Sequence, residues 1–169
     1  TAAAIARKVM TDYDITGKNV AILGAGPVGQ RTALYLLKEG ASKVTLTCRS
    51  MARSKATVEH MKKAYGVDVI PGETRSDEAV AALLKDAHVA IAAGPAGVCI
   101  VPEATWTASK TLEVIADVNA VPVRFYGAIA IGNFKMKVHR GAVASLFDTN
   151  DLFLDETTIY DIACKIDNA

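Results

Sequence analysis

The sequence is short of several residue types that would point to particular classes of protein. Of its 169 residues only three are cysteines, Cys48, Cys99 and Cys164, and they lack the spacing of paired or metal-binding cysteines. Aromatic residues make up 6% of the chain, and the 19 basic residues nearly balance the 18 acidic ones. We therefore expect a reduced, cytoplasmic protein without a metal site, and we expect neither nucleic acid nor a membrane surface as a partner.

Long apolar runs are also missing. The longest, at residues 89–101, is interrupted by Gly94, Pro95 and Gly97, so it predicts a buried strand and a loop and no membrane span. No secretory leader is visible. The chain starts at Thr1 without an initiator methionine, as a processed protein or a fragment would, and residues 1–10 predict a helix that Thr1 could cap.

Patterns typical of strands and helices alternate along the chain. Strands are predicted at residues 19–23, 43–48, 67–70, 88–93, 112–117 and 128–131. Helices are predicted at residues 32–39, 51–64, 77–84, 102–109 and 133–147, with a last one from about 155. This alternation predicts a Rossmann-like, doubly wound α/β fold, a mostly parallel sheet with helices on both faces. We expect one domain over residues 1–169, because the length suits a single core.

A glycine cluster separates the first strand from the helix that follows it. The glycines fit the spacing G-x-G-x-x-G, and the segment consists of Gly24, Ala25, Gly26, Pro27, Val28 and Gly29. In this context the first glycine permits a tight turn, the second lets a pyrophosphate approach, and the third lets the helix pack against its strand. The segment therefore predicts a dinucleotide-binding turn. The alternative is a glycine-rich turn that serves packing alone.

The chain lacks an acidic residue after the second strand, where an NAD-binding protein usually holds the ribose 2′-hydroxyl with a carboxylate. Arg49, Ser50 and Arg53 stand there instead. Arginine binds phosphate through charge-assisted hydrogen bonds, and a serine hydroxyl can add another. We therefore predict NADP as the cofactor, although the arginines could also be solvated residues at the start of a helix.

The ends of the fourth and fifth predicted strands offer further candidates. Small residues at Ala93 and Gly94 would let the ribose and nicotinamide lie against the backbone, unless they form a plain tight loop. Asp117 and Asn119 share one side of a continuing strand, so they could hold the carboxamide or orient a substrate. Local side-chain to backbone bonds that stabilise the loop are the alternative for this pair.

Residues 132–140 are rich in cations where a helix is predicted to begin. Positive charge is unfavourable at a helix N-terminus, and such a cost can mark an anion site. Lys135 and His139 would share one face of that helix. From the residues alone, a basic, solvated helix face is favoured over an anion site.

Several of these segments resemble the cofactor domain of NADP-dependent methylene-tetrahydromethanopterin dehydrogenases, enzymes of one-carbon metabolism in methylotrophs. The segments are residues 24–31, 47–49, 92–94, 115–120 and 132–140. The resemblance implies reversible hydride transfer between NADP and a methylene-tetrahydropterin, either methylene-tetrahydromethanopterin or methylene-tetrahydrofolate. It also implies a pterin-binding role for Lys135, and we expect a homo-oligomer. We expect the N-terminal pterin-binding domain of that family to be absent.

Two other functions remain open at this point. One is a non-catalytic NADP-binding or redox-sensing module. The other is the cofactor domain of a different two-domain dehydrogenase, such as one similar to shikimate dehydrogenase, whose catalytic residues would lie in its other domain.

Overall fold

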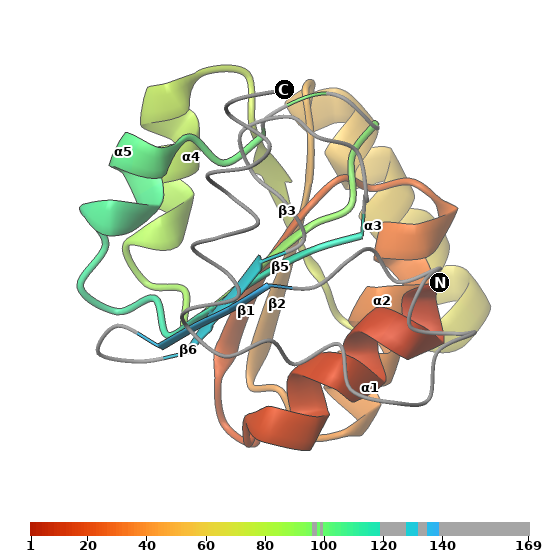
Figure 1. The fold of residues 1–169 in the computed structure, drawn as a ribbon. Helices are drawn as coiled ribbons and strands as arrows, with labels where there is room; N and C mark the ends of the chain where they lie inside the picture. The colour runs from red at the N-terminus through yellow and green to blue at the C-terminus, as the bar shows by residue number, and fades with distance from the viewer. Residues whose placement is uncertain (96–97, 99, 119–127, 132–134, 139–169) are drawn as a thin grey trace.

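The structure is a computed structural model, and it describes residues 1–95, 98, 100–118, 128–131 and 135–138 (Figure 1). Its main sheet has five parallel strands in the order β3-β2-β1-β4-β5. These strands are β1 (Asn19–Leu23), β2 (Lys43–Cys48), β3 (Ile70–Glu73), β4 (Val89–Ala92) and β5 (Val114–Asp117). The helices are α1 (Ala2–Asp12), α2 (Pro27–Lys38), α3 (Met51–Tyr65), α4 (Asp77–Leu84) and α5 (Glu103–Thr107). The predicted Rossmann-like fold is therefore confirmed.

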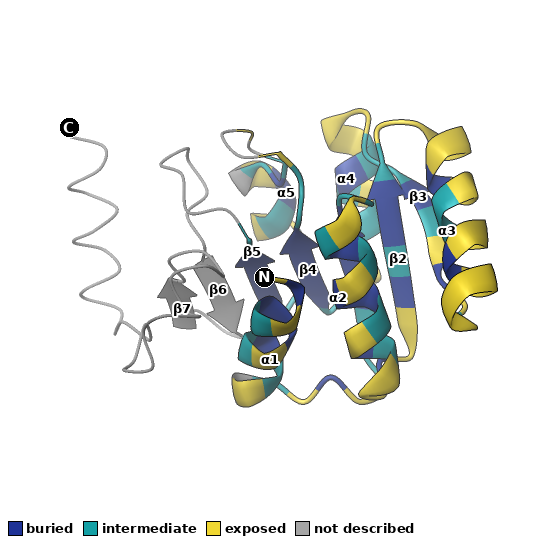
Figure 2. Cartoon of the chain, turned by 90° about the vertical axis from the view of Figure 1, so that its right-hand side faces the viewer, coloured by how far each residue is buried: buried dark blue, intermediate teal, exposed yellow. Residues whose placement is uncertain are grey.

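Helices cover both faces of this sheet, α1, α2 and α3 on one and α4 and α5 on the other (Figures 1 and 2). Side chains alternate between the faces along each strand. Val20 and Ile22 of β1 accordingly belong to the core under α1 and α2, whereas Ala21 and Leu23 belong to the core under α4. A strand covered on both faces is expected to be apolar, as β4 is throughout and as β5 is up to its last residue, Asp117.

Turn and cap residues set several element boundaries. Gly66 ends α3 with φ 66°, a left-handed conformation that favours glycine. Ser76 begins α4, and its hydroxyl accepts a hydrogen bond of 3.3 Å from the amide of Ala79. Thr1 occupies the N-cap position of α1, but its side chain makes no capping hydrogen bond. Its carbonyl oxygen accepts from the amide of Ile5 instead.

The third strand differs from the sequence prediction. It spans Ile70–Glu73, three residues later than the predicted 67–70. Pro71 lies inside it and pairs with Leu46 of β2. A proline is tolerated there because β3 is the edge strand of the sheet and needs a ladder partner on one side only.

Two short strands follow the main sheet. The predicted strand at residues 128–131 is confirmed as β6 (Ala128–Ile131), which pairs antiparallel with β7 (Lys135–Val138). The helix predicted over residues 133–147 is therefore wrong at residues 135–138. Residues 135–138 form a strand because they pair with β6, and local sequence patterns do not reveal this pairing. The helix predicted from about residue 155 lies outside the described residues.

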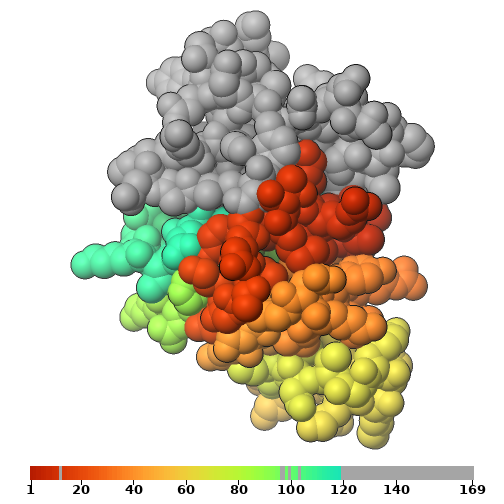
Figure 3. Space-filling model, turned by 90° about the horizontal axis from the view of Figure 1, so that it is seen from below, coloured from red at the N-terminus to blue at the C-terminus, as the bar shows by residue number. Residues whose placement is uncertain are grey.

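The start of the chain is tied to the amino end of the sheet. The Tyr13 hydroxyl donates a hydrogen bond to Glu113 Oε2, and Lys18 Nζ lies 3.4 Å from the same oxygen. The Tyr13 hydrogen bond, more than the Lys18 charge, lowers the pKa of the Glu113 carboxyl. Seen from below, the red N-terminal segment lies next to the orange segment that follows it and next to the teal segment of β5, which is distant in sequence (Figure 3). These contacts fix α1 against the sheet.

Candidate functional site

The turn between β1 and α2 lies at the carboxyl edge of the sheet, beside the point where the strand order reverses. β1 is flanked by β2 on one side and by β4 on the other. The chain passes from β1 outward to β2 and β3, and then crosses back to place β4 on the other side of β1. Gly24 follows β1 with φ 133°, which a residue with a side chain rarely adopts. A Cβ at Gly24 would also lie 2.5 Å from the carbonyl oxygen of Ala93, beyond β4. Gly24 therefore lets the turn close over the neighbouring strand.

The other two glycines of the motif have contrasting surroundings. A Cβ at Gly29 would collide with the carbonyl oxygen of Gly24, so only glycine lets α2 pack this close to β1. Gly29 is buried, whereas Gly26 is exposed, and a Cβ at Gly26 would meet nothing within 4 Å. The turn is thus tightly packed on its protein side and open at its centre.

The open side of the turn faces the N-terminus of α2. Gly26 is the N-cap, Pro27 occupies the first turn, and no side chain caps the helix. Its first turn carries no acidic residue, so the amides of Val28 and Gly29 keep their positive potential. The Gln30 side-chain amide donates a 3.0 Å hydrogen bond to the Ala25 carbonyl, which holds the loop in shape. This arrangement suits an anion such as a phosphate.

A hollow lies beyond the carboxyl ends of β2 and β3. It is lined by Arg49 and Ser50 from the β2–α3 turn, by Glu73 at the end of β3, and by Thr74 and Arg75 after it. Two of the predicted phosphate-binding residues therefore meet in one hollow. Arg53 is exposed on α3 and is not among the lining residues.

The lining residues after β3 escaped sequence reasoning. Placing the third strand at residues 67–70 left Glu73 and Arg75 in a loop with no defined neighbour. With the strand at Ile70–Glu73, register alone sets Glu73 opposite Cys48, at the end of β2. A carboxylate therefore does stand near the end of the second strand, supplied by the adjacent strand.

The end of β4 contributes the small residues predicted from the sequence. The Ala93 amide donates a 2.9 Å hydrogen bond to the Leu23 carbonyl, so the segment after β4 stays beside the glycine turn. A Cβ at Gly94 would meet the far end of the Ile100 side chain, which can move aside, so packing alone does not require glycine at this position. Residues 96, 97 and 99 lie outside the described residues.

The end of β5 places Asp117 beside β4. Asp117 is 7% exposed and pairs in register with Ala92. Its predicted neighbour Asn119 lies outside the described residues. Lys135 begins β7, so its predicted position on a helix face with His139 is wrong. The substrate-binding role of Lys135 stays a prediction.

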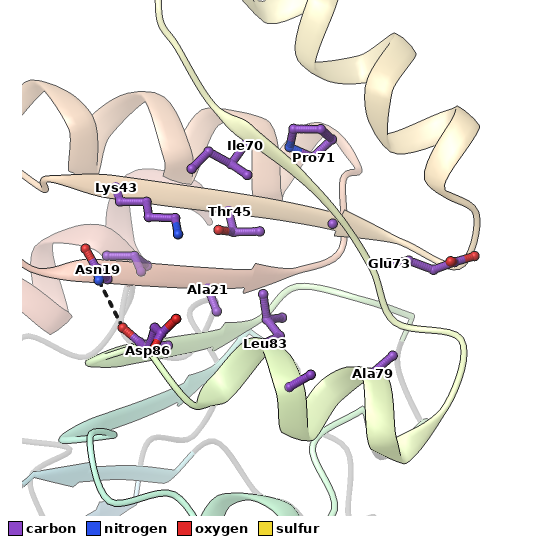
Figure 4. A pocket seen from close by; sticks show the side chains of 14 residues that line it. Asn19, Ala21, Lys43, Thr45, Ile70, Pro71, Glu73, Ala79, Leu83 and Asp86 are labelled. Carbon is purple, nitrogen blue, oxygen red and sulfur yellow. Dashed lines mark hydrogen bonds between the residues drawn. The ribbon is translucent and has the colours of Figure 1, made fainter.

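A second hollow lies on the face of the sheet beside α4 and does not include the glycine turn (Figure 4). It is lined by the amino-terminal halves of β1 and β2, by the whole of β3, and by residues of α4 together with Asp86 and Ala87 after it. The Asn19 side chain donates a 3.0 Å hydrogen bond to the Asp86 carbonyl, which closes one end. Glu73 lines this groove as well as the hollow beyond β2 and β3, but none of the residues predicted for cofactor binding lines the groove.

Two other kinds of feature are missing from the described part of the chain. Among its residues, no group of three or more His, Cys, Asp or Glu side chains is arranged to hold a metal ion. Within the same residues no helix is long and apolar enough to cross a membrane.

The family model described as "Shikimate / quinate 5-dehydrogenase" matches residues 4–123. Two curated relatives come from Methylorubrum extorquens strain AM1. The "Bifunctional protein MdtA" is 33% identical over 168 residues, covering 88% of this chain and 58% of the relative. The "NAD(P)-dependent methylenetetrahydromethanopterin dehydrogenase" is 30% identical over 183 residues, covering 95% and 62%. The chain thus spans about three fifths of the length of these relatives.

Solved structures share the fold. A dipicolinate synthase from Bacillus halodurans is 25% identical with a TM-score of 0.57, over 72% of this chain and 38% of its own. Shikimate 5-dehydrogenase from Listeria monocytogenes is 18% identical with a TM-score of 0.55, over 69% and 43%. The latter likeness concerns the fold alone. The family match covers most of the chain, including every residue from the glycine turn to Asp117. The chain therefore belongs to the shikimate / quinate 5-dehydrogenase family and contains a Rossmann-like domain of the oxidoreductase type.

Proposed function

We propose that this chain binds NADP as the cofactor domain of an oxidoreductase that transfers hydride between NADP and a methylene-tetrahydropterin. The observation that carries the binding part is the glycine turn. Gly24 and Gly29 have no space for a side chain, whereas Gly26 faces open space at the N-terminus of α2. Packing alone explains why Gly24 and Gly29 are glycines. The open centre is what a pyrophosphate needs, so a turn that serves packing alone does not explain the motif.

The preference for NADP over NAD is supported by the hollow beyond β2. Arg49 and Ser50 line it, and both are exposed. A 2′-phosphate there would accept charge-assisted hydrogen bonds from the guanidinium. Glu73 in the same hollow opposes a dianion, so the preference depends on the arginines outweighing one carboxylate. Arg53 would act from the first turn of α3.

The chemistry is hydride exchange at the nicotinamide ring, which the cofactor supplies when it is bound. The protein's own residues would hold and orient it. The amides of Val28 and Gly29 would face the pyrophosphate, Ala93 and Gly94 would form a close backbone wall, and Asp117 would lie toward the nicotinamide end. Asn119 and Lys135 would serve the carboxamide and the pterin. Catalysis would then depend mainly on positioning.

The pterin is favoured over other substrates by the curated relatives. One of the two relatives is named for methylenetetrahydromethanopterin, at 30% identity over 95% of this chain. The family description favours a second candidate, a shikimate- or quinate-type hydroxy acid. Both candidates use the same cofactor domain, so the substrate assay has to decide between them.

Titration with NADPH and NADH, followed by nicotinamide fluorescence, tests the cofactor proposal. We expect NADPH to bind more tightly. Equal affinities, or tighter NADH binding, would contradict the preference for NADP. An Arg49→Asp variant should shift the preference toward NADH.

Hydride transfer is tested by incubating the chain with NADP and either methylene-tetrahydromethanopterin, methylene-tetrahydrofolate, shikimate or quinate. We expect NADPH to form with one of the two pterins. Formation with shikimate or quinate alone would favour the second candidate. NADPH binding without turnover on any of them would favour a non-catalytic cofactor-binding module.

A further inference from the structure

The loop between β3 and α4 is bound to the end of β2 by hydrogen bonds. The Thr74 amide donates to the Cys48 carbonyl at 2.9 Å, and the Thr74 hydroxyl reaches the same oxygen at 3.4 Å. The Thr47 hydroxyl lies 3.5 Å from that of Thr74. Thr74 therefore holds the loop directly beside the β2–α3 turn that carries Arg49.

Arg75 is fixed at its backbone on both sides. Thr74 precedes it, and Ser76, which follows it, caps α4 through the amide of Ala79. The Arg75 side chain itself is exposed and lines the hollow together with Arg49. Each of the two loops thus presents one guanidinium to the same space.

Among the residues that the structure describes, neither guanidinium forms an ion pair with a carboxylate. Within the described part of the chain the ion pairs are Lys18–Glu113 and Lys62–Asp68, both away from this hollow. Glu73 lines the hollow without forming an ion pair with either arginine there. Glu73 also lines the groove beside α4, where β3 ends (Figure 4). The hollow therefore combines two cations with one carboxylate, a net positive charge suited to an anion.

We propose that Arg75 is a specificity-determining residue that binds the 2′-phosphate of NADP from the side opposite Arg49. This inference rests on the proposed cofactor function. A phosphate dianion between two guanidinium groups accepts hydrogen bonds from both and removes their mutual repulsion. Glu73 limits the affinity for the phosphate, since it repels a dianion in the same hollow.

Binding of adenosine 2′,5′-bisphosphate and adenosine 5′-monophosphate to the wild type and to Arg75→Ala, measured by calorimetry, tests this assignment. These probes isolate the adenosine end of the cofactor. We expect Arg75→Ala to weaken binding of the 2′,5′-bisphosphate about tenfold, as for loss of one charge-assisted hydrogen bond, and to leave the monophosphate unchanged. Glu73→Gln should strengthen binding of the bisphosphate alone.

Lys85→Ala is the matched control. Lys85 is an exposed cation at the opposite end of α4, so its removal changes the net charge equally without touching the hollow. We expect bisphosphate affinity in this variant within twofold of the wild type. Circular dichroism checks that Arg75→Ala is folded, as expected for an exposed side chain.

The outcomes separate the two proposals. A wild type that binds NADPH, with a ratio of bisphosphate to monophosphate affinity that Arg75→Ala leaves unchanged, overturns the assignment of Arg75 alone. A wild type that binds neither NADPH nor NADH overturns the cofactor proposal, and the assignment of Arg75 with it. An equal loss in Arg75→Ala and Lys85→Ala also overturns the assignment, because it reveals an effect of net charge only.

Discussion

The three glycines of the turn between β1 and α2 differ in what surrounds them, and this difference separates binding from folding. Gly24 and Gly29 lie against backbone atoms, whereas Gly26 has open space around it and an extended backbone, φ −74° and ψ −179°, that any residue can adopt. A side chain at Gly26 would therefore fill the proposed pyrophosphate site without disturbing the fold. A side chain at Gly29 would separate α2 from β1.

Gly26→Val and Gly29→Ala form a matched pair that tests this distinction. We expect Gly26→Val to keep wild-type stability and to lose NADPH binding. Gly29→Ala should be destabilised by about 2 kcal/mol, a typical cost of overpacking. Urea unfolding and fluorescence titration measure the two quantities. Undiminished NADPH binding by a folded Gly26→Val would mean that the pyrophosphate does not occupy this turn.

Glu113 gives the chain a predictable response to acid. Hydrogen bonding from Tyr13, and then the Lys18 charge, lowers the pKa of its carboxyl below the ordinary value of 4.5. A carboxyl whose pKa is lowered on folding stabilises the protein above its unfolded pKa, and this contribution is lost as the pH falls through the lower folded value.

Glu113→Gln should therefore reduce the free energy of unfolding by about 1 kcal/mol at neutral pH. The value is modest because Glu113 and its partners Tyr13 and Lys18 are partly exposed. The difference from the wild type should shrink progressively below pH 4.5. Urea unfolding at pH 7 and at stepwise lower pH measures this, with Glu59→Gln on the exposed face of α3 as a control. A difference that is constant with pH would show that the carboxylate charge is not involved.

At the scale of elements, α3 is joined to the edge of the sheet by one buried hydroxyl. Ser54 donates a 2.7 Å hydrogen bond to the Leu46 carbonyl of β2 and accepts one of 3.1 Å from the Gly72 amide of β3. Ser54 is completely buried. Its hydroxyl thus satisfies two backbone groups that water does not reach.

Ser54→Ala should cost about 2 kcal/mol, because it leaves these two backbone groups without a partner. The Gly72 amide should exchange its hydrogen faster than in the wild type. Ser42→Ala serves as the control. Ser42 is exposed, and the hydrogen bond from its backbone amide to the Lys18 carbonyl is retained in the variant, so stability should not change. Wild-type stability together with unchanged exchange at Gly72 would contradict this account of how β3 is held.

Local patterns predicted most elements of the main sheet because hydrophobic spacing and cap residues determine them locally. The strand at Lys43–Cys48 and the helix Asp77–Leu84, capped by Ser76, have the predicted bounds. The third strand was misplaced because Pro71 and Gly72 are strand breakers in most contexts, and only an edge position accommodates them. The strand at Lys135–Val138 depends on pairing with β6, which no local pattern contains.

The same misplacement explains which part of the candidate site the sequence did not predict. The glycine turn and Arg49 could be predicted from motif spacing, because each directly follows the strand that positions it. Glu73 and Arg75 join them only through the pairing of β2 with β3. A strand prediction shifted by three residues therefore conceals half of the hollow.

At the scale of the whole molecule, the loops that follow β1, β2, β3 and β4 gather at one end of the sheet. The turn after β1, the β2–α3 turn, the β3–α4 loop and the segment after β4 all lie at the carboxyl ends of parallel strands. The groove beside α4 lies along the amino-terminal halves of β1 and β2 and along β3 (Figure 4). A dinucleotide bound as proposed would lie across these carboxyl ends and would meet the groove only at Glu73.

Hydrogen exchange with and without NADPH should therefore show local protection at the carboxyl ends of the strands and none at the groove apart from Glu73. We expect added protection at residues 24–30, 48–53 and 73–76, because NADPH would cover these loops and stabilise the folded state by about 2.7 kcal/mol at a hundredfold excess over its Kd. The amides at the groove, such as those of Lys43 and Asp86, should gain only the protection from exchange that this global stabilisation produces. NADH should protect residues 24–30 as NADPH does but leave residues 73–76 less protected, since it lacks the 2′-phosphate. Local protection centred on the groove would place the ligand at the wrong edge of the sheet and contradict the proposed binding mode.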